Sequence, residues 1–92
     1  MIEYVSAMEV RALDGFRLWL RFSNGRVGVR DFADILAEGG DVIEPIRDET
    51  MFRRVFISMG VPTWPSGLQL DPTNLHMELQ AANTLSTPVA AE

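Results

Sequence analysis

One histidine and a few carboxylates are the side chains of this chain that could carry acid–base chemistry. Asp71 and His76 are a candidate pair for a catalytic dyad. The nucleophile of such a site would have to be Ser58, Ser66 or a threonine, and no Gly-x-Ser-x-Gly turn presents one. We therefore favour a His76 that lies on the surface or stabilises a helix, and an Asp71 that caps the helix beginning at Pro72.

A second candidate is a set of acids at helical spacing, Asp31, Asp34 and Glu38. Carboxylates on one helix face can bind a hard metal ion or form an acid–base pair. No histidine is nearby in sequence to complete a ligand set, so helix capping and compensation of the helix dipole explain these acids better. We predict no metal site and no cofactor.

Composition excludes several classes of chemistry. The chain has no cysteine and no lysine, which rules out disulfides, thiolate zinc sites, a P-loop lysine and Schiff-base catalysis. Its net charge of −5 disfavours a generally basic nucleic-acid binder. The opening residues lack the pattern of a secretory signal, and no apolar run is long enough to span a bilayer, so we expect a cytoplasmic protein.

The elements that position these side chains begin with an antiparallel meander. Phe16 to Phe22 alternates apolar and polar residues with the period of a half-buried strand. Asn24-Gly25 favours a two-residue type I′ turn, followed by a strand with Val27 and Val29 facing inward. A three-residue loop at 13–15 keeps the apolar side chains of the first two strands on one face, because it pairs Val10 with Leu18.

This register predicts a charged outer face, the Arg/Trp face. The two-residue turn places Trp19 opposite Arg30. Five arginines then surround Trp19, with Glu9 as the nearest acid: Arg11, Arg17, Arg21, Arg26 and Arg30. Three interpretations stay open: a solvated sheet face, a docking surface for a partner protein or a second copy, and a nucleic-acid site. The candidate partner-binding residues are Arg17, Trp19, Arg21, Arg26 and Arg30.

The rest of the chain predicts short elements. We expect helical segments beginning after Asp31 and Asp48, strands at 54–59, 61–64 and 68–70, and a C-terminal helix from Pro72 to about Gln80. Residues 1–80 form one α+β domain in this interpretation, and 81–92 a disordered tail. The predicted core consists of Met8, Val10, Phe16, Leu18, Leu20, Phe22, Val27, Val29, Phe32, Leu36, Phe52, Val55, Ile57, Trp64, Leu70 and Leu75.

The most specific motif is the stretch Trp64-Pro65-Ser66-Gly67, followed by Leu70-Asp71-Pro72. It could line a small pocket, but a core tryptophan followed by a tight turn explains it better. With Phe16 to Gly25, Arg30-Asp31-Phe32 and Pro45 to Asp48, this stretch resembles the bacterial family called domain of unknown function 2442. The resemblance makes Trp64, Pro65, Gly67, Asp71 and Pro72 a family signature, although His76 stands where the family usually has tyrosine.

The resemblance implies a small α+β protein built on such a meander. Some members carry a further helix-turn-helix domain, and many are neighbours of a second small family, domain of unknown function 4160. That arrangement resembles a two-component toxin–antitoxin or regulatory pair, and the family supplies no catalytic residues. We therefore expect a non-enzymatic, antitoxin-like interaction module that binds a second small protein or forms a homodimer; nucleic-acid binding through the Arg/Trp face is the alternative.

Overall fold

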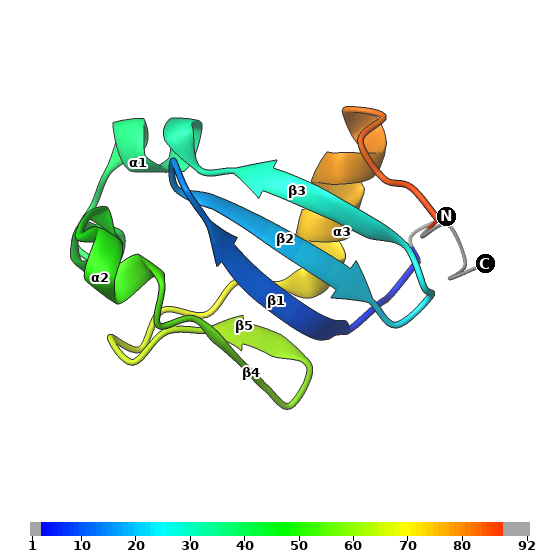
Figure 1. Cartoon of the computed structure of the whole chain (residues 1–92), viewed down its shortest axis with the longest axis horizontal. Helices are drawn as coiled ribbons and strands as arrows, with labels where there is room; N and C mark the ends of the chain where they lie inside the picture. The colour runs from blue at the N-terminus through cyan, green and yellow to red at the C-terminus, as the bar shows by residue number, and fades with distance from the viewer. Residues whose placement is uncertain (1–2, 88–92) are drawn as a thin grey trace.

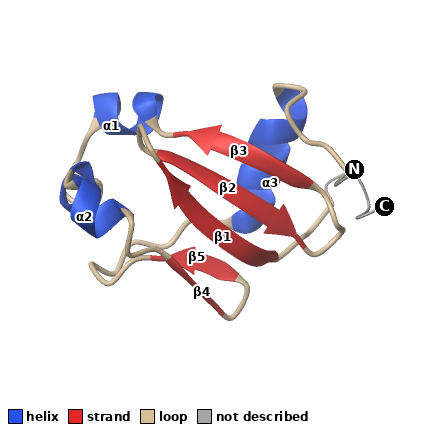
Figure 2. Ribbon diagram, in the orientation of Figure 1, coloured by secondary structure: helices blue, strands red, loops and turns tan. Residues whose placement is uncertain are grey.

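The chain folds as an α+β protein, which confirms the predicted class (Figure 1). A computed structural model describes residues 3–87 of the 92. The helices and strands, in chain order, are β1 (Ala7–Leu13), β2 (Arg17–Phe22), β3 (Val27–Asp31), α1 (Ala33–Glu38), the 3₁₀ helix η1 (Glu44–Arg47), α2 (Glu49–Phe52), β4 (Phe56–Ser58), β5 (Val61–Thr63) and α3 (Pro72–Ala81). Strands β1, β2 and β3 form an antiparallel meander, and β4 and β5 form a separate hairpin (Figure 2).

Helix α3 covers one face of the meander, which we call the inner face, and lies behind the sheet in Figure 1. Gly28 lies close to α3 and to the segment after it: an added Cβ would stand 3.0 Å from a Leu79 methyl carbon and 3.3 Å from the Thr84 carbonyl oxygen. A larger residue would require Leu79 and the segment at Thr84 to shift by a few tenths of an ångström. The buried core consists of Val5, Ala7, Leu18, Leu20, Phe22, Phe32, Ile46, Phe52, Trp64, Leu75 and Leu79.

The first hairpin has a three-residue loop, but at 14–16 rather than the predicted 13–15. Leu13 pairs with Arg17, and both Gly15 and Phe16 have positive φ, 78° and 57°. Phe16 leaves the strand and packs its ring edge against Phe52, with centroids 5.2 Å apart. The register shifts by two residues, so the same side chains stay on the same face.

The second hairpin corrects the sequence analysis more seriously. Its loop has three residues, 23–25, because the Phe22 amide donates to the Arg26 carbonyl (2.9 Å) and Arg21 pairs with Val27. A shift of one residue moves every side chain of the strand to the other face. Val29 therefore pairs with Trp19 on the outer side and is 38% exposed, while Gly28 and Arg30 lie on the inner side.

A register shift between Ala7 and Glu9 also corrects the predicted core. It marks a bulge at Met8, which is 53% exposed, while Ala7 is buried. Met8, Val27 and Val29 are therefore not core residues; Val27, like Val29, lies on the outer side, where it pairs with Arg21. The buried residues that the sequence analysis did not place in the core include Val5, Ala7, Ile46, His76 and Leu79.

The segments just before β1 and just after α3 pack against the rest of the domain. The Thr73 hydroxyl accepts from the Val5 amide (3.1 Å) and donates to its carbonyl (3.2 Å). Past α3, in the segment expected to be a tail, Ser86 exchanges both backbone hydrogen bonds with Val27, each 2.8 Å long. Residues 88–92 of that predicted tail lie outside the described residues.

Candidate functional site

The outer face of the meander is a regular grid of nine side chains, three from each strand. Paired residues form three rows: Glu9–Arg21–Val27, Arg11–Trp19–Val29 and Leu13–Arg17–Asp31. Trp19 is the centre of this grid and is half-buried by its neighbours. Helix α3 lies on the opposite side of the sheet, and the view in Figure 2 shows this face open. We use the name outer face for these nine residues.

Charges on the outer face are partly paired. The Arg11 guanidinium lies 5.5 Å from the centre of the Trp19 ring, a cation–π distance. Glu9 accepts from Arg11 (2.8 Å) and from Arg21 (3.4 Å), and the Arg11 hydrogen bond is the main cause that lowers the pKa of Glu9. Arg17 makes no ion pair with any residue between 3 and 87, and its side chain donates to the Asp14 carbonyl (2.9 Å). The face thus carries a small excess of positive charge.

Two of the five arginines predicted for the Arg/Trp face, Arg26 and Arg30, do not lie on the outer face. Arg30 turns to the inner side, where its side chain is only 13% exposed and binds Asp34 (2.9 Å) and Glu78 (3.1 Å). Asp34, the larger contribution, and Glu78 raise the pKa of Arg30, and Arg30 in turn lowers that of Asp34. Arg30 thereby ties β3 to α1 and α3, a structural role.

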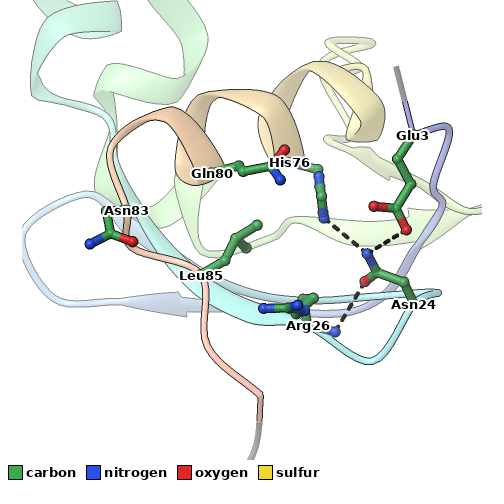
Figure 3. Close-up of a pocket in the computed structure, with 7 residues that line it drawn as sticks. All are labelled: Glu3, Asn24, Arg26, His76, Gln80, Asn83 and Leu85. Carbon is green, nitrogen blue, oxygen red and sulfur yellow. Dashed lines mark hydrogen bonds between the residues drawn. The ribbon is translucent and has the colours of Figure 1, made fainter. Parts of the chain in front are cut away.

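Arg26, the other displaced arginine, lines a polar pocket of about 230 Å³ beside α3 (Figure 3). The lining residues are Glu3, Asn24, Arg26, His76, Gln80, Asn83 and Leu85. We call this the polar pocket.

Asn24 organises one wall of the polar pocket. Its amide nitrogen lies 3.0 Å from the Glu3 carboxylate and 3.0 Å from His76 Nε2, and its oxygen accepts from the Arg26 amide at 3.0 Å. Because the backbone N–H needs an oxygen acceptor, the amide nitrogen faces His76 and donates to it. His76 Nε2 then accepts this hydrogen bond.

The structure separates Asp71 from His76, the candidate dyad. Asp71 caps α3 by accepting the Thr73 amide (2.9 Å), as predicted. His76 is 2% exposed, bonds to Asn24, and packs its ring edge against Phe22, while its Nδ1 has no partner among the described residues. His76 is thus a core residue rather than a surface one. The signal that was available is its spacing of three residues from Leu79, on the helix face that packs against the sheet.

The other acids of the sequence analysis also stay apart. Asp34 pairs with Arg30, and Asp31 accepts the Ala33 amide (2.8 Å) at the start of α1, where Phe32 is the capping residue. Between residues 3 and 87 no group of three or more potential metal ligands comes together.

Trp64 is 1% exposed and closes the core, as the motif predicted. Its indole N–H donates to the Phe52 carbonyl at 3.0 Å, and its backbone N–H donates to the Leu68 carbonyl at 2.9 Å. Gly67, at φ 100°, completes the turn after Pro65, and Asp71-Pro72 then begin α3. The structure thus gives each of the five signature residues a place in turn, core or helix start.

Comparison with known proteins matches residues 7–80, most of the chain, to one family, described as "Protein of unknown function (DUF2442)". The chain belongs to this DUF2442 family. No curated protein and no solved structure matches it. The DUF2442 match covers the outer face and the signature from Trp64 to Pro72, but not Glu3, Asn83 or Leu85 of the polar pocket. No helix within residues 3–87 is long and apolar enough to cross a membrane.

Proposed function

We propose that this DUF2442 chain is a non-enzymatic interaction module that binds a partner protein through the outer face. The observation that carries this proposal is Trp19, a large aromatic side chain at the centre of a sheet face that no helix or strand within residues 3–87 covers. Tryptophan and arginine are the residue types most enriched at the energetic centres of protein interfaces. Here Arg11 and Val29 flank Trp19 in one row.

The charges of the outer face define the partner. Arg17 makes no ion pair within the described residues, whereas Glu9 partly neutralises Arg11 and Arg21. A complementary surface therefore has an apolar centre over Trp19 and Val29, and carboxylates at its rim opposite Arg17. A second copy fits less well, because its own outer face carries the same excess of arginine and the whole chain has a net charge of −5.

The nucleic-acid alternative loses support from the corrected register. Only three of its five arginines remain on the face, and Glu9 and Asp31 share that face with them. A backbone-binding surface needs several free cations. A regulatory, antitoxin-like role in a two-protein system stays a prediction of the family resemblance, and so does a cytoplasmic location.

The test uses the full chain with an affinity tag as bait in its native host, with nuclease, and compares three forms. The first is the wild type, the second is the combined Arg17→Ala, Trp19→Ala, Arg21→Ala variant, and the third is Arg54→Ala. Arg54 is an exposed arginine that lies outside the outer face, so it controls for charge. We expect one stoichiometric protein on the wild type and on Arg54→Ala, and its loss from the combined variant.

Calorimetry with that purified partner then gives the decisive number. Loss of a central tryptophan should weaken binding at least about 30-fold, the effect of an interface hot spot. A partner that the combined variant still binds with unchanged affinity would overturn the proposal. So would light scattering that shows a homodimer dissociated by Trp19→Ala, since the face would then be occupied by a second copy.

A further inference from the structure

The polar pocket lies on the opposite side of the sheet from the outer face and plays no part in the proposed function. We propose that it binds a small zwitterionic molecule with one carboxylate and one amine, such as a free amino acid. The carboxylate would meet Arg26 and the amine would meet Glu3.

The first argument is charge. Arg26 and Glu3 are the two formally charged side chains that line the pocket. Arg26 makes no ion pair with any residue between 3 and 87. An anion alone would be repelled by Glu3, and a cation alone by Arg26, whereas a molecule with both charges satisfies both groups.

The second argument is that the wall between these two charges is already built. Asn24 bonds the Glu3 carboxylate through its amide nitrogen and the Arg26 backbone through its oxygen, each at 3.0 Å. The buried His76, 2% exposed, binds the Asn24 amide nitrogen through its Nε2 at 3.0 Å and so fixes the Asn24 side chain. Figure 3 shows this network on one side of the pocket. A ligand would therefore not have to order these groups when it binds.

The third argument is the size of the pocket and the chemistry of the residues that line it opposite Asn24. A pocket of about 230 Å³ is smaller than the sites of drug-sized molecules, typically about 300–1,000 Å³. Gln80 and Asn83 offer amide donors and acceptors, and Leu85 offers an apolar contact for a side chain. Carboxylate, amine and a short mixed side chain together describe an amino acid.

The test is an NMR titration of the ¹⁵N-labelled full chain with single L-amino acids at up to about 10 mM, which detects millimolar affinity. Acetate and methylammonium serve as half-molecule probes. We expect at least one amino acid to shift the side-chain amide signals of Asn24, Gln80 and Asn83 together. Neither half-molecule should do so at the same concentration.

Conservative variants assign the two charges. Arg26→Gln and Glu3→Gln should each weaken binding about tenfold or more. Arg54→Gln and Glu38→Gln, which change exposed charges outside the pocket, should leave the affinity unchanged. Unchanged backbone spectra away from the pocket show that each variant is folded.

Three results would overturn the proposal. The first is that no amino acid shifts the three amide signals. The second is that acetate binds as tightly as every amino acid and Glu3→Gln has no effect, which would make the site a simple carboxylate site. The third is that the control variants lose as much affinity as the pocket variants. These outcomes leave the outer face untested, so they are distinguishable from failure of the proposed function.

Discussion

Trp19 and Leu20 are neighbours in β2, yet they belong to surfaces of opposite character. Leu20 is fully buried on the inner face, where α3 and the segment after it lie close against Gly28 of β3. Trp19 is the centre of an outer face that is open in the structure. The alternation of a strand thus separates side chains that hold the fold from side chains that are free to bind.

The largest expected difference between the two faces is seen when Leu20 and Trp19 are each replaced by alanine. Leu20→Ala should lower the free energy of unfolding by about 2–5 kcal/mol, since it leaves a cavity in the core. Trp19→Ala should lower it by no more than about 1 kcal/mol, a surface value. Urea denaturation of both purified variants measures the difference. Equal losses would mean that Trp19 holds the fold, and the contrast between the faces would disappear.

A second pair of substitutions compares the faces within β3. Gly28→Val should cost about 1–3 kcal/mol of stability, because its side chain would collide with Leu79 and the Thr84 carbonyl. Val29→Ala, one residue along on the outer face, should cost about 0.5 kcal/mol or less. Thermal unfolding of the two variants side by side checks this. A Gly28→Val protein as stable as the wild type would show that α3 does not pack as described.

A third substitution sharpens the role of the polar pocket in the fold. Asn24→Ala removes the donor to the buried His76 and should lower stability by about 1–3 kcal/mol, the range for an unsatisfied buried polar group. Asn74→Ala, at an exposed position on α3, is the matched control and should have little effect. If the two variants are equally stable, the Asn24–His76 contact contributes nothing to the fold.

The smallest expected effect is a loss of stability at low pH. It involves two carboxylates, Glu9 on the outer face and Asp34, which pairs with Arg30 on the inner side. Hydrogen bonds from Arg11 and Arg30 lower the pKa values of Glu9 and Asp34 from their ordinary values of 4.5 and 3.8. A lowered pKa contributes stability above the ordinary value, and this stability is lost as the pH falls through the value in the folded state. Glu9 is partly exposed and Asp34 is exposed, so the loss is small and should shrink further in high salt.

Denaturation curves at neutral pH and near pH 3 measure how much the free energy of unfolding falls in acid. These two pH values lie above and below the ordinary carboxylate pKa values of about 4. Glu9→Gln and Asp34→Asn should each lose less stability than the wild type over that interval. Asp41→Asn, at an exposed acid for which no ion pair is found in residues 3–87, is the control and should match the wild type. Identical acid dependence in all four proteins would contradict the assignment.

Local patterns in the sequence predicted the fold class and the core of β2. Alternation alone placed Leu18 and Leu20 inside and Trp19 outside, and the structure agrees. The helix caps at Asp48 and Asp71 were also predictable, since an aspartate just before a helical pattern can accept a hydrogen bond from a backbone N–H of the first helical turn. These features depend on residues close in sequence.

The errors came from contacts between distant residues. Asn24-Gly25 is typical of a two-residue turn, but the loop here has three residues, and Asn24 binds His76, 52 residues away. This one extra residue in the loop places Val29 on the outer side and Arg30 on the inner side, the reverse of the prediction. Arg26 and Arg30, two of the five predicted arginines, are therefore not on the outer face. No spacing rule could have found the polar pocket, because its lining comes from Glu3, the second hairpin, α3 and the segment after α3.

The bonds that close the meander are made by residues that come much later in the chain. Val5 is held by Thr73, and Val27 by Ser86. A ribosome adds about 5–20 residues each second, so for seconds after the meander is synthesised its inner side lacks the cover that Leu75 and Leu79 of α3 provide. During synthesis this inner side, rather than the tryptophan-bearing one, is the surface that a chaperone or a protease would meet first.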